Sequence, residues 1–188
     1  AVLLLCAPAM ADNYGVIIID SILSLKIGPD DVKRMDEIVI RTFKNAVNDR
    51  DTVPKNMGEA KMSTLFSAAL ALVRGRVGID DFKDEILNDP LIKEVMRKIK
   101  LIVDEDMEKA FPDKRIARVE VRFENGETME KSAELARGEP ETPFTREELK
   151  QKFHFLTRRF IGDKDVEKIE DMIYGSLEQS SRELIKFL

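Results

Sequence analysis

The sequence has very few side chains of the kinds that form disulfides and metal sites. Its 188 residues include one cysteine, one histidine and no tryptophan. Cys6 has no second cysteine for a disulfide or a cysteine-rich zinc site, and His154 has no second histidine for a paired-histidine metal motif. We therefore expect no metal, no cofactor and a reducing compartment, which favours the cytoplasm.

Long apolar runs and an excess of basic charge are absent as well. No run approaches the roughly 18–20 apolar residues that a membrane helix needs. The formal net charge is −5, with 36 acidic against 31 basic side chains. This balance argues against nucleic acid as the main partner. We expect a partner that is neither a membrane nor a nucleic acid.

The apolar start of the sequence, AVLLLCAPAMA (residues 1–11), resembles the core of a signal peptide. It lacks the basic leading segment that a signal peptide carries. We favour a buried interdomain segment, residues 1–13, over a signal remnant.

A regular helix pattern lies in the stretch EAKMSTLFSAALALVRGRVGIDDF, from Glu59 to Phe82. Ser63 is placed to cap the helix start, because its hydroxyl can accept from an unpaired backbone N–H. Gly75 can end the helix in the left-handed conformation. Between them runs an apolar stripe with helical spacing: Leu65, Ala68, Ala69, Leu72 and Val73. The pattern predicts a capped core helix with one face toward a sheet or a second helix.

Short segments with alternating apolar residues predict a small sheet. Asp36–Phe43 and Ile99–Val103 are predicted strands, and Ala117–Leu135 is predicted to be a hairpin. Asn125–Gly126 favours a type I′ turn at the hairpin tip, because both residues tolerate positive φ angles.

Other segments predict helices and one long loop. Tyr14–Leu25 is predicted to be a helix, although its β-branched run also allows a strand. Asp80–Leu87 and Leu91–Lys98 are predicted short helices. Lys44–Gly58 has little periodicity and is expected to be a loop that leads into the central helix.

The last part of the chain is predicted to be a linker and a pair of helices. Gly138–Phe144 is expected to be rigid and extended, and Thr145 with Glu148 forms a capping box. Apolar side chains recur at helical spacing on the two helices: Leu149, Phe153, Leu156, Phe160, Val166, Ile169, Ile173, Leu177 and Leu184.

Together these patterns predict an α+β fold. We expect a small mixed sheet of three or four strands with packed helices in residues 14–136. A linker and two C-terminal helices follow in residues 137–188.

Several sequence blocks follow one another in a characteristic order. EAKMS (59–63) leads into ALAL (69–72), GRV (75–77) and Phe82; RVEV (118–121) precedes NGET (125–128); RGEPETP (137–143) precedes EEL (147–149) and KF (152–153). In order and spacing these blocks resemble the C-terminal part of the MmgE/PrpD superfamily. That superfamily includes 2-methylcitrate dehydratase, cis-aconitate decarboxylase and iminodisuccinate epimerase.

The resemblance implies that residues 14–136 form a lid domain, which in this family stands beside a long helical domain. The C-terminal helices would then pack on that helical domain. The 188 residues contain no counterpart of the helical domain, so the resemblance implies either a fragment or one chain of a split enzyme. It also implies a lyase or isomerase acting on a small di- or tricarboxylate; if active, the protein would be a carbon–oxygen lyase such as a dehydratase.

The acid/base residues of the family are not matched in this chain. Before the first lid helix the family carries a Lys, a Pro and one or two His residues ahead of an Asp. Here the segment reads LCAPAM (5–10), followed by Tyr14 and Asp20. Phe66 stands where decarboxylase-like members have a Tyr. Because Leu, Met and Phe do not titrate, we leave the catalytic residues unassigned and expect no catalysis by the isolated chain.

An alternative is a binding or assembly module that retains the fold without the chemistry. Under both hypotheses we expect a helical-domain partner chain or a homo-oligomer, because the apolar stripes of the terminal helices would otherwise be exposed.

Lys61, Ser63 and Arg76 are the candidate substrate-binding residues. Lys61 and Ser63 match the family motif at the start of the central helix, where a cation and a helix N-terminus favour a carboxylate. Arg76, with Arg74, could bind an anion. Each also has an ordinary structural explanation: Ser63 as a cap, Lys61 as a solvated cation, and the two arginines as charges matched to the helix dipole.

The remaining polar residues are expected to be structural. His154 is predicted to be a surface or partly packed residue without nearby partners, and Cys6 an inert buried thiol. The acidic pairs Asp30–Asp31, Asp80–Asp81 and Asp104–Asp106 lack the spacing of a calcium loop and are expected to cap helices and turns.

Overall fold

The computed structural model describes residues 14–47 and 53–175, which fall into two compact units. The larger unit ends at Pro143 and the smaller begins at Phe144. The expected interdomain segment, residues 1–13, lies outside the described residues, as do Cys6, Leu177 and Leu184.

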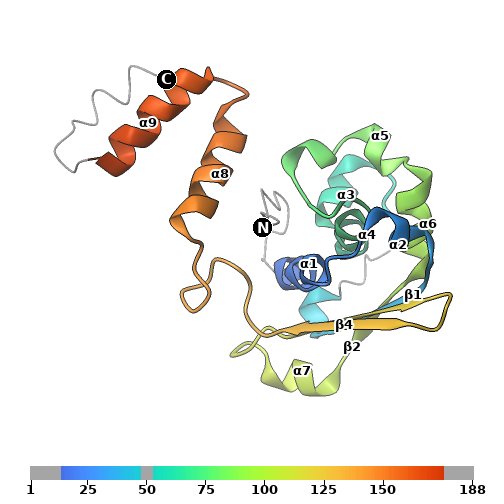
Figure 1. The fold of residues 1–188 in the computed structure, drawn as a ribbon. Coiled ribbons are helices and arrows are strands. Elements are labelled where there is room, and N and C mark those ends of the chain that lie inside the picture. The colour runs from blue at the N-terminus through green and yellow to red at the C-terminus, as the bar shows by residue number, and fades with distance from the viewer. Residues whose placement is uncertain (1–13, 48–52, 176–188) are drawn as a thin grey trace. The chain divides into compact units, whose positions relative to one another are not determined.

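Helices and strands alternate through the larger unit, and the smaller unit holds two helices (Figure 1). The elements of the larger unit are α1 (Tyr14–Ser24), α2 (Pro29–Lys33), β1 (Met35–Thr42), the 3-10 helix η1 (Lys44–Ala46), α3 (Met57–Met62), α4 (Thr64–Arg74), the 3-10 helix η2 (Ile79–Asp81), α5 (Asp84–Leu87), α6 (Pro90–Lys98), β2 (Ile99–Val103), α7 (Glu105–Ala110), β3 (Ala117–Phe123) and β4 (Thr128–Ala133). Those of the smaller unit are α8 (Arg146–Thr157) and α9 (Asp163–Gly175).

The four strands form one mixed sheet in the order β2-β1-β3-β4. β1 pairs with β2 in parallel and with β3 antiparallel, and β3 and β4 form a hairpin. A parallel pair needs a crossover connection, and the helices from α3 to α6 provide it. The predicted α+β fold with a small mixed sheet is therefore confirmed.

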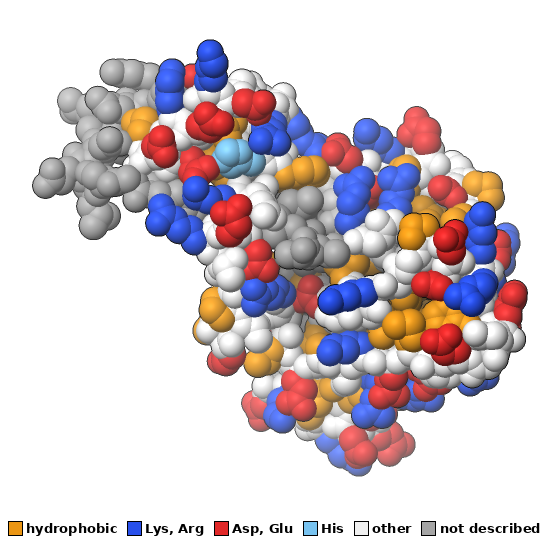
Figure 2. All heavy atoms as spheres, in the orientation of Figure 1, with side chains coloured by type: hydrophobic (Ala, Val, Ile, Leu, Met, Phe, Trp, Pro, Cys, Tyr) orange, Lys and Arg blue, Asp and Glu red, His pale blue; other side chains and the backbone are white. Residues whose placement is uncertain are grey.

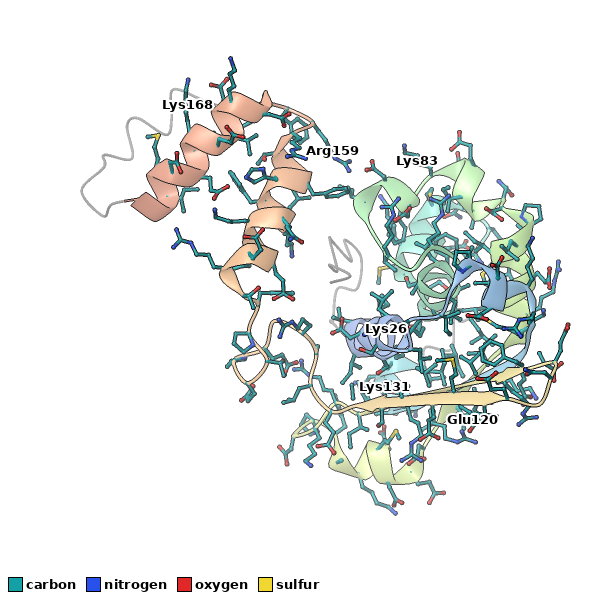
Figure 3. The ribbon with its side chains drawn as sticks, viewed as in Figure 1. Lys26, Lys83, Glu120, Lys131, Arg159 and Lys168 are labelled. Carbon is teal, nitrogen blue, oxygen red and sulfur yellow. The ribbon has the colours of Figure 1, made fainter. Side chains whose placement is uncertain are left out.

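The sheet has one apolar face and one charged face. Ile38 and Ile40 on β1 and Val121 on β3 are fully buried, and α1 and α4 lie on this side of the sheet (Figure 1). Lys131 shares this side through its pairing with Val119, whereas Glu120 points to the opposite side (Figure 3). The alternation explains why the strands could be predicted from the sequence.

The opposite face of the sheet carries a continuous set of ion pairs. Glu37 on β1 contacts Lys100 of β2 and Arg122 of β3, and Glu120 contacts Arg122 and Arg41. Acidic and basic side chains are interspersed in the same way over much of the molecular face shown in Figure 2.

Helix α4 is the centre of the larger unit. It contacts α1, α2, α3, α6 and β2. Ser63 caps it, since its hydroxyl accepts from the Phe66 N–H at 3.0 Å, and Gly75 ends it with a φ of 62°. Both predicted caps are confirmed. The buried surface of α4 is wider than the predicted one-sided stripe. Every residue from Thr64 to Leu72 is buried, as in a helix surrounded by other elements.

The segments that flank α4 differ from the sequence prediction. The expected loop before it ends early, because Asn56 caps a separate helix, α3, by accepting from the Glu59 N–H at 2.9 Å. The predicted helix Asp80–Leu87 is instead split into η2 and α5. Helix α7 was not predicted; Asp104, expected to be a capping residue, begins it by accepting from two backbone N–H groups.

The hairpin turn between β3 and β4 is not of type I′. Gly126 has a φ of 84°, but Asn125 is not among the residues with positive φ, which a type I′ turn requires of both. The Gly126 N–H donates to the Phe123 carbonyl at 2.9 Å, and the Phe123 N–H donates to the Glu127 carbonyl at 2.9 Å, which gives a three-residue loop. The Asn125 side chain accepts from the Glu127 N–H, so this side chain stabilises a turn in which only the glycine is left-handed.

The expected extended linker after β4 is a compact loop over residues 136–142. The Gly138 N–H donates to the Thr142 carbonyl at 2.8 Å, and the Thr142 hydroxyl donates to the Ala136 carbonyl at 2.6 Å. Gly138 takes a φ of 102°, which favours glycine at this position. Because Thr142 binds backbone groups within the loop, the segment does not extend.

The smaller unit has the predicted capping box but little apolar core. The Glu148 N–H donates to the Thr145 hydroxyl at 3.2 Å, and the Thr145 N–H donates to Glu148 at 2.7 Å. Val166 is fully buried, whereas Phe160 is 85% exposed and Ile173 is 53% exposed. The predicted apolar stripes are therefore only partly covered within this unit.

Candidate functional site

The start of α4 brings two of the three predicted site residues together. Lys61 lies in the last turn of α3 and is exposed, and Ser63 follows it as the residue that ends α3 and begins α4. The Ser63 side chain is buried and held by the Phe66 N–H. The next residue is fixed as well, since the Thr64 hydroxyl donates to the Ala46 carbonyl at 3.1 Å. These bonds fix the start of α4, and the exposed Lys61 comes two residues before its cap.

The electrostatics at this end of α4 favour an anion. The aligned peptide dipoles of a helix place partial positive charge at its N-terminus. Lys61 adds a full positive charge next to it. A carboxylate bound here would gain from both, with Lys61 as the flexible contact.

The third predicted residue, Arg76, lies beyond the other end of α4. Its Nη2 atom is 3.2 Å from the Oδ1 atom of Asp81, and the Nη1 atom of Arg74 is 3.1 Å from the same oxygen. The Gly78 N–H donates to the other carboxylate oxygen at 2.8 Å. Asp81 is fully buried, so its charge requires these partners.

The sequence indicated the two arginines as dipole-matched charges but did not indicate this pairing. Asp81 was expected to cap a turn, and it does so through its bond to Gly78. The Asp81 carboxylate both caps the turn and binds the two arginines. Only the fold shows this combination.

The length of α4 separates the predicted site residues into two groups. The helix has 11 residues and therefore spans roughly 16 Å. Lys61 and Ser63 lie at its N-terminus, and Arg76 lies past its C-terminus. A small polycarboxylate that touches the first group does not reach the second.

Phe66 lies in the core one turn into α4. It is fully buried, and its ring is tilted against that of Phe82 with the centroids 5.9 Å apart. A tyrosine at this position would bring a hydroxyl, whereas Phe66 brings only apolar surface. Phe66 thus supplies no group that could transfer a proton at this position.

Asp20, the aspartate singled out by the resemblance, lies on α1 and is half-buried. Its Oδ2 atom accepts from the Arg137 backbone N–H at 2.6 Å. Burial raises the pKa of the Asp20 carboxyl above its usual range, while the Arg137 N–H and the Arg137 charge lower it. No local pattern in the sequence indicates this contact, because 117 residues separate the two partners.

His154, predicted to lack partners, lies beside a buried carboxylate. Its Nε2 atom contacts Glu170 of α9, and Glu170 also accepts from the Lys150 ammonium. The bonds from Lys150 and His154, in that order, lower the pKa of Glu170, and Glu170 in turn raises the pKa of Lys150. The prediction for His154 was wrong on this point, because Glu170 lies on a different helix.

The described ranges contain no cluster of three or more His, Cys, Asp or Glu side chains suited to a metal ion. None of the helices in residues 14–47 and 53–175 is long and apolar enough to cross a bilayer.

A comparison with protein families finds one match. The chain fits the model of the MmgE/PrpD C-terminal domain over residues 17–175. The matched range runs from α1 through α9 and includes Lys61, Ser63 and Arg76. Among curated proteins, no significant match is found.

Proposed function

The chain belongs to the MmgE/PrpD family, whose C-terminal domain it carries, and on this premise we propose that it is the lid part of a lyase or isomerase acting on a small di- or tricarboxylate. If active, it would be a carbon–oxygen lyase of the dehydratase type. Its single cysteine suits the reducing cytoplasm, where we propose that it works.

The observation that carries this proposal is the exposed Lys61 beside the rigid N-terminus of α4. In this proposal the Lys61 ammonium binds one substrate carboxylate, and the helix N-terminus capped by Ser63 supplies the adjacent positive potential. A polycarboxylate has a further carboxylate to present to residues outside this site.

Arg76 is proposed as a second anion contact, separate from the first. The Arg76 side chain is 40% exposed and shares Asp81 with Arg74, so two cations contact one carboxylate. Because α4 stands between the two ends, the contributions of Arg76 and Lys61 to binding should be independent.

We propose that catalysis requires groups supplied by a helical-domain partner chain or by a second copy of this chain. Support comes from Phe66, which offers no proton, and from two exposed apolar residues of the smaller unit, Phe160 between α8 and α9 and Ile173 on α9. A base must titrate near the working pH, which the Phe66 side chain cannot do.

Ligand binding tests the site directly. Citrate, aconitate and aspartate should be titrated against the chain by calorimetry, with acetate as a monocarboxylate control. We expect Lys61→Ala to weaken tricarboxylate binding about tenfold, as for the loss of a charge-assisted bond. Lys33→Ala, which removes another exposed lysine, should leave binding unchanged. Equal binding by wild type and Lys61→Ala would exclude this site.

Complex formation tests the need for a partner. The chain should be mixed at micromolar concentration with a helical domain of the same family that carries the His and Lys acid/base residues. We expect a stable complex by size-exclusion chromatography and dehydratase activity only in the mixture. Activity of the isolated chain would contradict the proposal, and so would a complete absence of binding to the helical domain.

A further inference from the structure

Asp20 joins two parts of the larger unit that are far apart in the sequence. It projects from α1, between buried residues of that helix, and its carboxylate accepts from the Arg137 backbone N–H at 2.6 Å. Because its partner is the backbone N–H of Arg137, the contact fixes the position of the backbone at residue 137. A contact with the Arg137 side chain would fix only that side chain.

The loop that Asp20 holds has its own internal structure. Within residues 136–142, the Gly138 N–H donates to the Thr142 carbonyl and the Thr142 hydroxyl donates to the Ala136 carbonyl, as described above. A second contact joins this loop to the segment before β3, since the Nη1 atom of Arg115 lies 3.4 Å from the Oε1 atom of Glu139. The larger unit ends at Pro143, directly after the loop.

We propose that Asp20 is a positioning residue whose carboxylate holds the loop 136–142 on α1. It thereby fixes the point where the chain leaves the larger unit, before α8 begins. This role goes beyond the proposed function, because it requires neither a ligand nor activity. Because internal bonds keep the loop compact, the anchor at Arg137 helps to position all of it, together with the Arg115–Glu139 contact.

The surroundings of Asp20 make this anchor sensitive to its charge. Helix α1 packs on α4, η1, β3 and β4. Three of these elements contribute a charged group: Lys131 on the helix side of β4, Lys44 of η1 and Arg74 at the far end of α4. The side of β3 that faces α1 is apolar. The loop contributes Arg137, whose N–H and charge both favour the ionised carboxylate.

Burial opposes that ionisation and is the stronger influence, so the pKa of Asp20 lies above the usual range of an aspartate. A hydrogen bond to an ionised carboxylate is stronger than one to the neutral acid. The anchor should therefore weaken as the pH falls through this raised pKa, before exposed aspartates are protonated.

The Arg137 amide resonance tests the anchor without any mutation. In a ¹H–¹⁵N correlation spectrum of the full chain, we expect the Arg137 amide proton to move with pH and to report the titration of Asp20. Asp20→Asn should abolish this movement. The Gly78 amide, which donates to Asp81 in the same way, provides the control and should be unaffected by Asp20→Asn. A chemical shift of the Arg137 amide proton that does not change with pH in this range would overturn the proposal.

Trypsin provides a second measurement, since it cleaves after Arg137. At a fixed neutral pH, we expect Asp20→Ala to speed cleavage at this bond about tenfold, as for the loss of a hydrogen bond to a charged group. Asp20→Asn retains an acceptor oxygen and should restore most of the protection. Asp36→Ala removes an exposed aspartate of β1 and should not change the rate. Equal cleavage of Asp20→Ala and wild type would also overturn the proposal.

Discussion

Asp81 holds the corner after α4 because three partners converge on its buried carboxylate. Arg74, Arg76 and the Gly78 N–H all bind it. The carboxylate lies in an environment that would strongly disfavour an unpaired charge, so the arginines compensate for its burial. The same contact orients Arg76, which fixes the direction of the second proposed anion contact.

Removing this carboxylate should be costly. We expect Asp81→Ala to lower the free energy of unfolding by about 3 kcal/mol, since it leaves two arginines and one N–H without their partner. Urea denaturation followed by circular dichroism measures the change. Asp84→Ala, at an exposed position of α5, should cost much less. Equal effects of the two substitutions would mean that the arginines are satisfied by solvent.

At the residue scale, local capping contacts could be predicted from the sequence and distant contacts could not. Ser63 and Thr145 each bind an N–H three residues ahead, so a short motif contains both partners. Asp20 and Arg137 meet only because α1 packs beside β4, and no local pattern contains that information. The division of the candidate residues between the two ends of α4 could be predicted from its caps, whereas the shared contact of Arg74 and Arg76 with Asp81 required the structure.

The helix pair α8–α9 is held together mainly by polar contacts at its centre. Glu170 of α9 is buried between Lys150 and His154, which lie one turn apart on α8. Among the described residues of α9, Val166 is the fully buried apolar side chain. The register of the two helices is thus specified by one acidic residue and two partners.

This pair should come apart when Glu170 loses its charge. We expect Glu170→Gln to speed amide hydrogen exchange in α8 and α9, because the bonds from Lys150 and His154 weaken together. Exchange in the larger unit should stay slow. Glu167→Gln makes the same charge change at an exposed position of α9 and serves as the control. The resonance of His154, the one histidine in the chain, reports the contact directly. Unchanged exchange in Glu170→Gln would show that apolar packing holds the pair.

The pH dependence of the pair follows from the same pKa shifts. The folded-state pKa of Glu170 is lowered, so its contribution to stability is present above the pKa of an unfolded glutamate, about 4.3, and is lost as the pH falls through the folded value. The pKa of Lys150 is raised, so its contribution is present below about 10.4 and is lost as the pH rises through the folded value. The pair should be most stable between these limits.

At the element scale, periodicity predicted the type of most elements but not their surroundings. The stripe on α4 correctly indicated a helix, yet residues off the stripe such as Phe66 and Leu70 are buried as well, so a one-sided pattern underestimates burial there. The hairpin was placed correctly because β3 alternates cleanly, while its turn type depended on the bond from the Glu127 N–H to the Asn125 side chain. Turn geometry is decided by single contacts that composition does not specify.

For the whole molecule, the exposed apolar residues of the smaller unit form the surface on which we propose that a partner packs. Phe160 is 85% exposed, far more than the other large apolar side chains in the described residues. An exposed phenylalanine contributes little to the folded monomer, and it stabilises an assembly when a partner buries it.

A substitution at Phe160 should therefore change assembly and leave folding intact. We expect Phe160→Ser to shift the chain to a smaller species in size-exclusion chromatography with light scattering, or to weaken its complex with a helical domain about tenfold. Ile79→Ser, which removes an exposed apolar residue of the larger unit, provides the control. Identical elution and affinity for wild type and Phe160→Ser would place the partner surface elsewhere.

At this scale the order of the sequence blocks indicated the family, and the match over residues 17–175 confirms it. The position of the C-terminal helices on a helical domain stays a prediction. It depends on residues beyond those of this chain, so neither local pattern nor internal packing decides it.

The position of β1 at the centre of the sheet has a consequence for synthesis on the ribosome. Ile38 pairs on one side with Ile99 and on the other with Val121, both much later in the chain. Local contacts therefore cannot complete the sheet, and two long loops must close first. Until Ile99 has emerged, β1 has neither neighbour, and its apolar face is open to wrong pairing with other chains. The sheet of this domain is thus completed late in translation, and in that interval the core helices made before Ile99, among them α1 and α4, can cover the apolar face of β1.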